Sequence, residues 1–183
     1  MTDELPSSAT PPVFAGRGKF PLPVEVRREG LKDYLRVTCE RSAALRGRHP
    51  FEELKSILFQ SKNLEFYVMA HVPGDMRVDE KALADEVGPL QMVPQSEMAR
   101  LGLEKGRVNP FTAELYLTDK PVIHVLCPLV FQIEQVHSNN DSVGGWITFR
   151  PQDVIHWVEH VRVHRISKTK KTQKHGESKS SEA

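Results

Sequence analysis

The sequence has few cysteines and no long apolar segment. Its 183 residues include only two cysteines, Cys39 and Cys127, which form no C-x-x-C pair. We therefore expect no disulfide framework and a reduced, cytoplasmic setting. No apolar run approaches the roughly 18 residues that a membrane helix requires, and residues 1–12 carry neither the basic nor the apolar segment of a secretory signal. A membrane is not an expected partner.

An excess of charge and the familiar catalytic motifs are also missing. The formal net charge is +1, so nucleic acid could be bound through a local basic patch but not through the charge of the whole chain. The sequence contains no G-x-S-x-G, no Walker loop, no G-x-G-x-x-G and no H-E-x-x-H. We predict no cofactor.

Three histidines recur at four-residue spacing near the end of the chain. His156, His160 and His164 would share one face of a helix, as metal ligands can. No Cys, Asp or Glu motif completes a ligand set, and the apolar residues Val154 and Val158 fall on the opposite face. We therefore predict a solvated helix face and no metal site.

Composition divides the chain into three parts. Residues 1–23 contain five prolines among small and polar residues, which predicts a disordered, proline-rich arm. Residues 24–166 have the length and apolar patterning of one folded domain. Residues 167–183 carry five lysines and almost no apolar side chains, which predicts a flexible basic tail.

Within the domain, apolar spacing predicts helices and strands in mixed order. Helical spacing extends over 29–46, 79–87, 94–101 and 151–161, and Asp79 and Gly88 are suited to cap the second of these helices. Strands are predicted at 64–71, with one face toward the core, and at 90–93, 113–117, 122–127, 129–133 and 146–149. Residues 137–145 read as a polar loop. This order is typical of an α+β fold with a mixed β-sheet.

The loop from Gly102 to Phe111 contains the spacing Gly106-x-x-x-Pro110. Glycine allows a positive φ and a close approach of another group, whereas proline fixes φ and removes a hydrogen-bond donor. One interpretation is a helix C-cap at Gly102 followed by a tight turn. The other is a loop of fixed shape that directs backbone N–H and C=O groups into a pocket.

Lys55 stands beside apolar residues in the segment Leu54–Phe59. A lysine at the edge of an apolar strand usually extends its amine to water. Alternatively, its compact charge is held in a pocket, where it would bind a phosphate or a carbonyl oxygen.

Several segments together resemble a known family. Leu54-Lys55-Ser56-Ile57-Leu58-Phe59, then Val72-Pro73-Gly74-Asp75, then Gly106-Arg107-Val108-Asn109-Pro110 occur in the order found in the YbaK family of prolyl-tRNA-synthetase-associated editing domains. The resemblance covers about residues 48–160. It implies a curved mixed β-sheet flanked by helices, and hydrolysis of mischarged aminoacyl-tRNA.

The resemblance also implies roles for individual residues. Lys55 would contact the substrate near the terminal adenosine or the ester. The backbone from Gly106 to Pro110, with Arg107, Val108 and Asn109 between them, would hold the aminoacyl group and orient the attacking water. Members of the family typically use neither a metal nor a covalent nucleophile.

A further similarity lies in His137-Ser138-Asn139-Asn140, which resembles the H-P-x-x-N segment of family members that clear Ala-tRNA(Pro). It implies that His137 and Asn140 bind substrate. Ser138 stands where those proteins have proline, and a plain loop histidine is the alternative for His137.

The resemblance predicts a trans-editing deacylase that acts on mischarged tRNA, either Ala-tRNA(Pro) or Cys-tRNA(Pro). Arg41, Arg46, Arg48 and the lysine-rich tail could supply contacts to tRNA phosphates. The alternative is a non-catalytic interaction module of an aminoacyl-tRNA synthetase complex that keeps the editing fold.

Overall fold

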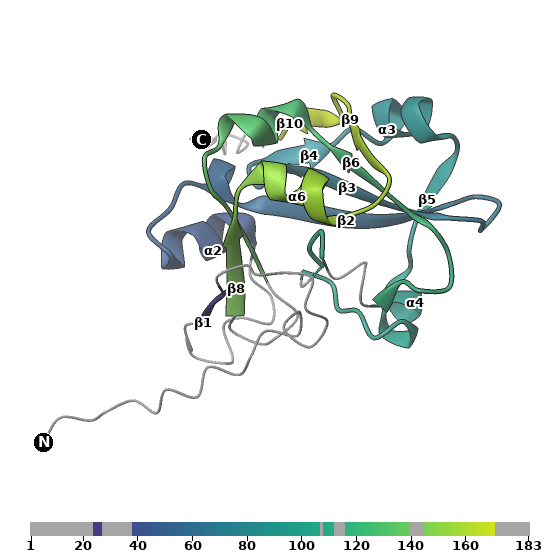
Figure 1. Cartoon of the computed structure of the whole chain (residues 1–183), viewed down its shortest axis with the longest axis horizontal. Helices are drawn as coiled ribbons and strands as arrows, with labels where there is room; N and C mark the ends of the chain where they lie inside the picture. The colour runs from purple at the N-terminus through teal and green to yellow at the C-terminus, as the bar shows by residue number, and fades with distance from the viewer. Residues whose placement is uncertain (1–23, 27–37, 107, 112–115, 140–144, 171–183) are drawn as a thin grey trace, which may run out of the picture.

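The computed structural model describes residues 24–26, 38–106, 108–111, 116–139 and 145–170. Its central sheet has five strands, in the order β5 (Leu90–Met92), β2 (Leu54–Ser61), β3 (Tyr67–Pro73), β6 (Val122–Leu126) and β9 (Val161–Val163). The pairs β5–β2 and β2–β3 are antiparallel, whereas β3–β6 and β6–β9 are parallel. The sheet is mixed, which confirms the predicted α+β class (Figure 1).

Smaller elements surround this sheet. A second sheet contains β1 (Val24–Val26), β8 (Gly145–Phe149) and β7 (Val136–Asn139), and a two-stranded ribbon pairs β4 (Met76–Val78) with β10 (Ser167–Thr169). The helices that flank them are α2 (Cys39–Leu45), α3 (Glu80–Val87), α4 (Gln95–Arg100) and α6 (Pro151–Trp157), with the 3-10 helices η2 (Pro50–Glu52) and η3 (Pro128–Gln132).

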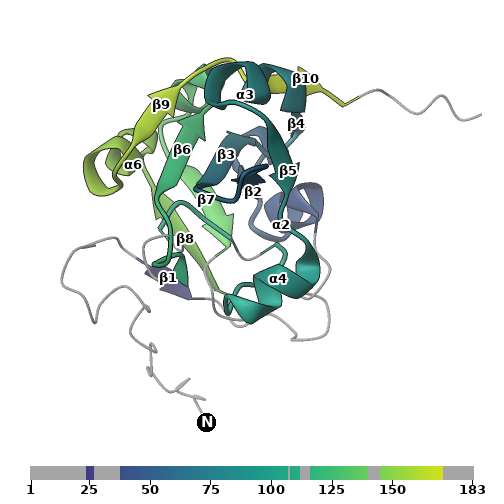
Figure 2. The ribbon, with the colours of Figure 1, turned by 90° about the vertical axis from the view of Figure 1, so that its right-hand side faces the viewer.

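Strand alternation gives the central sheet two apolar faces. Phe59 of β2 packs in one cluster with Leu83 of α3, whereas the next residue on the N-terminal side, Leu58, packs in another with Met98 of α4. We call these sides of the sheet the α3 face and the α4 face, and Figure 2 shows the two helices on opposite sides of the strands. Because both faces are covered, every residue of β3 is buried, and the prediction of a strand at 64–71 with one solvated face is wrong.

The ends of α3 follow the predicted caps. The Asp79 side chain accepts a hydrogen bond from the backbone N–H of Ala82 at 3.3 Å, and Gly88 ends the helix with a φ of +92°. The strands predicted at 90–93, 122–127 and 146–149 and the helix predicted at 94–101 are also present, with bounds that differ by one residue at one or both ends.

Two helices are shorter than their apolar spacing predicts. Thr38 has extended backbone and caps α2 with its side chain, so a helix over 29–46 is interrupted there, and residues 29–37 lie outside the described residues. The last predicted helix ends at Trp157, and His160 has a φ of +53° before β9 begins. His156, His160 and His164 therefore do not share a helix face.

Three further segments differ from the predicted type. Residues 129–132 of the strand predicted at 129–133 belong to η3, because Pro128 at its first position fixes a helical φ and lets Val130 reach the core. The predicted loop 137–145 includes β7, which pairs with β8. Of the strand predicted at 113–117, Tyr116 is helical and Leu117 has no strand pairing, while residues 113–115 lie outside the described residues.

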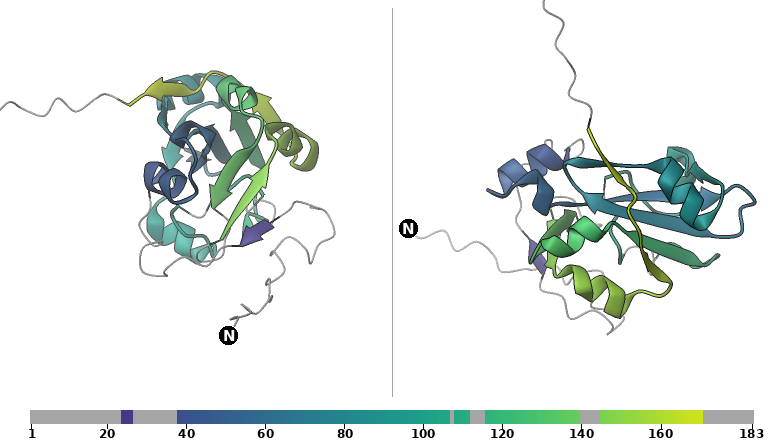
Figure 3. Two further views of the ribbon diagram at one scale, coloured as in Figure 1. Left: turned by 90° about the vertical axis from the view of Figure 1, so that its left-hand side faces the viewer. Right: turned by 90° about the horizontal axis from the view of Figure 1, so that it is seen from above.

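The predicted boundary of the basic tail at residue 167 is also wrong. Ser167, Lys168 and Thr169 form β10, and the buried Cys127 donates its thiol hydrogen to the Ser167 hydroxyl at 3.1 Å. This pairing carries the chain across the α3 side of the sheet (Figure 3). Residues 171–183 and the predicted arm 1–23 lie outside the described residues.

Candidate active site

The loop that contains Gly106 and Pro110 is fixed through an asparagine. Gly106 has a φ of +86°, a conformation that glycine adopts without strain. Asn109 is fully buried, and its side-chain oxygen accepts a hydrogen bond from the Phe111 N–H at 2.9 Å. Its amide nitrogen donates to the backbone carbonyl of Asn139 at 3.0 Å. The loop thus has a defined shape and is attached to β7.

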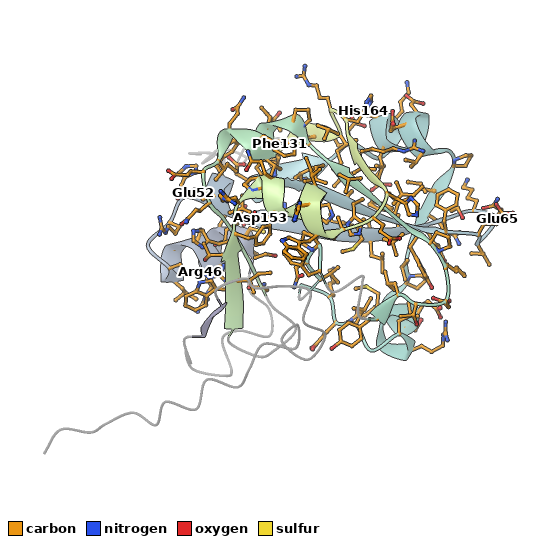
Figure 4. All side chains as sticks on the ribbon, viewed as in Figure 1. Arg46, Glu52, Glu65, Phe131, Asp153 and His164 are labelled. Atoms are coloured by element: carbon orange, nitrogen blue, oxygen red, sulfur yellow. The ribbon has the colours of Figure 1, made fainter. Side chains whose placement is uncertain are left out.

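A buried ion pair lies behind this attachment. The Nη1 of Arg46, at the end of α2, lies 2.7 Å and 2.9 Å from the two carboxylate oxygens of Glu53, and the two side chains are 3% and 4% exposed. The Nη2 of Arg46 donates to the side-chain oxygen of Asn139 at 2.8 Å, and the Asn139 amide nitrogen donates to the Gly106 carbonyl at 2.7 Å. Figure 4 shows Arg46 on the side of the molecule where α2 and β8 lie.

Burial and the neighbouring guanidinium have opposing effects on the pKa of Glu53. Burial raises the pKa of Glu53 to about 7, while the guanidinium of Arg46 acts in the opposite direction. The guanidinium also lies over the ring of Trp146, 4.8 Å from its centroid. Arg46 therefore cannot reach a tRNA phosphate, and its predicted role in phosphate binding is wrong.

A hydroxyl backed by two histidines lies on the α4 face. The Oγ of Ser56 is 2.8 Å from His71 Nδ1, and His71 Nε2 is 3.1 Å from His124 Nδ1. The two rings stack at 7° with centroids 5.4 Å apart. Burial lowers the pKa of both histidines, that of His124 to about 4, so both imidazoles are neutral at pH 7.

Ser56 lies in β2 between a residue that contacts β7 and one that packs in the same cluster as the loop. On one side, the carbonyl of Leu54 accepts a hydrogen bond from Ser138, which precedes Asn139, at 3.4 Å. On the other side, Leu58 packs in the same cluster as Val108. Side chains two residues apart in a strand point to the same face, so the face that carries Ser56 is the one against which Val108 packs, whereas Phe111 of the same loop belongs to the cluster of Phe59.

Lys55 points to the other face. Its Nζ donates to the Met76 carbonyl at 2.6 Å, and the side chain lines a cleft of about 290 Å³. Burial, and secondarily Arg77, lower the pKa of the Lys55 amine, whereas the Cys39 thiol and Asp75 raise it. The residues of this cleft come from β2, β4, α3, β5 and β10: Lys55, Ile57, Phe59, Arg77, Val78, Glu80, Met92 and Lys168.

The remaining residues implied by the resemblance have different positions. Val108 and Pro110 are buried in the loop. His137 is 4% exposed in β7, where its Nδ1 lies 2.9 Å from the Thr148 hydroxyl, so it is not a plain loop histidine. Arg107 and Asn140 lie outside the described residues.

Sequence reasoning missed the side chains that hold the loop. In the sequence, Arg46 is one member of a cluster of basic residues, and Glu53 is the second of two adjacent glutamates. No spacing distinguishes either residue from a solvated charge, because the two meet Asn139 only after the chain has folded. Over the described residues, no group of three or more His, Cys, Asp or Glu side chains could hold a metal, and no helix could span a membrane.

Comparison with known proteins agrees with this architecture. Residues 36–133, more than half of the chain, match the family model of the aminoacyl-tRNA editing domain. No curated protein matches the sequence significantly. The crystal structure of a candidate trans-editing enzyme for prolyl-tRNA synthetase is similar, with a TM-score of 0.69, 18% identity and coverage of 85% of this chain and 92% of that one.

A second crystal structure, of a hypothetical protein, also has a TM-score of 0.69 and 18% identity, and the match covers 85% of this chain and 96% of that chain. At this identity the likeness shows the fold alone, which is that of the YbaK-like domains. The family match is independent of it and covers Lys55 and the whole loop from Gly102 to Phe111. The chain therefore belongs to the aminoacyl-tRNA editing domain family.

Proposed function

We propose that this protein is a trans-editing aminoacyl-tRNA deacylase that hydrolyses the ester of a mischarged tRNA, with Ala-tRNA(Pro) or Cys-tRNA(Pro) as the substrate. The observation that carries the proposal is the Gly106–Pro110 loop, whose spacing resembles the family motif and which is anchored at both ends by side-chain hydrogen bonds of Asn109 and Asn139. The solved relative described as a candidate trans-editing enzyme for prolyl-tRNA synthetase supports the choice of tRNA. The reaction would take place in the cytoplasm.

The chemistry rests on positioning and on fixed dipoles. In ester hydrolysis water attacks the carbonyl carbon, negative charge develops on the carbonyl oxygen, and the ribose oxygen leaves with a proton. Backbone N–H groups of a rigid loop can stabilise that charge without reorganising. The Ser56 hydroxyl, held by the neutral His71, is a polar group on the same face that can orient the water.

Lys55 and the loop act on different parts of the substrate in this proposal. The Lys55 amine lies on the α3 face, in a cleft that Arg77 and Lys168 also line. These cations would hold phosphate oxygens near the terminal adenosine, while the loop holds the aminoacyl ester. Arg107 and Asn140 remain the proposed contacts to the aminoacyl-adenosine end, whereas Asn109 and His137 are buried and would act by holding the loop and β7 in place. The part of the chain from 171 to 183 would add phosphate contacts, and a synthetase is the proposed protein partner.

The proposal is tested by deacylation of a panel of charged tRNAs: Ala-tRNA(Pro), Cys-tRNA(Pro) and Pro-tRNA(Pro). We expect selective hydrolysis of one mischarged species and none of Pro-tRNA(Pro). A folded protein that hydrolyses no species would instead favour the non-catalytic module of a synthetase complex. In that case binding to the synthetase is the next measurement.

Gly106→Ala is expected to lower kcat/KM by about tenfold. A Cβ at Gly106 meets no atom within 4 Å, but its φ of +86° is strained for alanine by about 1–2 kcal/mol. The loop would relieve this strain by moving. Gly88→Ala is the matched control, because Gly88 has a φ of +92° and equally open surroundings at the end of α3. Equal activities of the two variants would contradict a catalytic role for the loop.

A further inference from the structure

We propose that Arg46 and Glu53 are positioning residues that set the shape of the Gly106–Pro110 loop through the side-chain amide of Asn139. The inference rests on the proposed function and adds to it a group of residues that never touch the substrate. The path has three steps, from the Glu53 carboxylate to the Arg46 guanidinium, from there to the Asn139 amide, and from the amide to the Gly106 carbonyl.

The contact with Arg46 fixes the orientation of the Asn139 side-chain amide. A guanidinium can only donate, so the group of Asn139 that faces Arg46 must be its oxygen. The amide nitrogen of Asn139 must then point the other way, where it donates to the Gly106 carbonyl at 2.7 Å. The buried positive charge therefore excludes the flipped amide, which would place an oxygen against that carbonyl.

The geometry requires the two arms of an arginine. One Nη of Arg46 serves Glu53 and the other serves Asn139, while the plane of the guanidinium covers Trp146. A lysine ammonium is a point charge without this planar fork. Glu53 in turn holds the arginine in place and keeps its charge paired, since an isolated buried charge is strongly unfavourable.

Stability alone does not account for the buried ion pair of Arg46 and Glu53. A buried ion pair loses so much hydration that an apolar pair of similar volume is often equally stable. The Nε of Arg46 is buried without a hydrogen-bond partner among the described residues, which adds to the cost. What an apolar pair could not supply is the donor to Asn139.

Two variants separate positioning from stability. In the double variant Arg46→Met/Glu53→Leu no buried charge is left unpaired, but the donor to Asn139 is lost. Asn139→Asp leaves both members of the ion pair in place and gives Arg46 an additional acceptor, but it puts an oxygen against the Gly106 carbonyl. The exposed ion pair of Glu97 and Arg100 on α4 provides the matched control as Glu97→Gln/Arg100→Gln.

We expect both test variants to fold, to keep KM for the mischarged tRNA within about twofold, and to lose at least about tenfold in kcat. The control should match the wild type. Hydrogen exchange of the backbone amides of Val108, Asn109 and Phe111 should be faster in both test variants. A folded Arg46→Met/Glu53→Leu protein with the kcat of the wild type would overturn the inference. If that variant does not fold, a kcat and an exchange rate equal to those of the wild type in Asn139→Asp would overturn it.

These outcomes are distinguishable from a failure of the proposed function. If the wild type hydrolyses no charged tRNA, the deacylase proposal fails, but the exchange measurement still tests whether the buried pair fixes the loop. Unchanged exchange at Val108, Asn109 and Phe111 in both variants would then reject the positioning role by itself.

Discussion

Replacement of Gly74 by alanine is expected to lower the free energy of unfolding by about 3 kcal/mol. Gly74 follows β3, and its N–H donates to the Glu53 carbonyl at 2.7 Å. A Cβ there would lie 2.5 Å from the Pro50 carbonyl oxygen, 2.8 Å from the Glu53 Cβ and 2.9 Å from the Cys39 Cβ. None of these atoms is the free end of a flexible side chain, so α2, η2 and the start of β2 would have to move.

The measurement is chemical denaturation of wild type and variant at pH 7. Gly47→Ala serves as the control, because its Cβ would meet no atom within 4 Å and only its φ of +63° opposes the change, by about 1–2 kcal/mol. Because Glu53 is one of the three contacts, we also expect Gly74→Ala to reduce deacylation. If Gly74→Ala is no less stable than Gly47→Ala, the packing of α2 against this turn is looser than the structure indicates.

Acidification from pH 6.5 to pH 4 is expected to remove about 3 kcal/mol of stability through His124. The pKa of His124 is lowered from 6.5 to about 4, first by burial and then by the nearby His160. Between these two values the unfolded chain binds more protons than the folded one, so stability falls as the pH falls. The pKa of His71 is lowered well below 6.5 by burial and by His124, which acts in the same direction.

Ionisation of Glu53 changes stability with pH in the opposite direction. The contribution of His124 must therefore be measured by comparing variants. The pKa of Glu53 is raised from 4.5 to about 7. The stability that this gives is present below pH 4.5 and is lost as the pH rises through 7. Stability should be measured by denaturation at several pH values for wild type and for His124→Leu, with His156→Gln on the exposed surface of α6 as a control. The wild type should lose more stability than His124→Leu over this range, and identical slopes would contradict the assignment.

The sequence by itself determined the elements whose signals are local. Asp79 and Gly88 mark the ends of α3 because a side-chain cap and a positive φ depend only on neighbouring residues. The order of motifs that resembles the family is likewise readable from the sequence alone. A local pattern cannot show how many layers cover a strand, which is why β3 was assigned only one buried face. Nor does helical spacing alone show where α6 ends and β9 begins.

Only the tertiary structure decided which charged residues lie near the loop. Arg46 and Asn139 are 93 positions apart, and their hydrogen bond forms because α2 and β7 pack at the same end of β2. Lys55 and Ser56 are adjacent in sequence, but the alternation of a strand sends one to the cleft of the α3 face and the other to the α4 face, where Leu58 packs. Pairing with β4 likewise makes Ser167–Thr169 a strand, although its lysine and polar residues predict a solvated tail. Each of these outcomes depends on contacts between distant segments, which local sequence patterns do not encode.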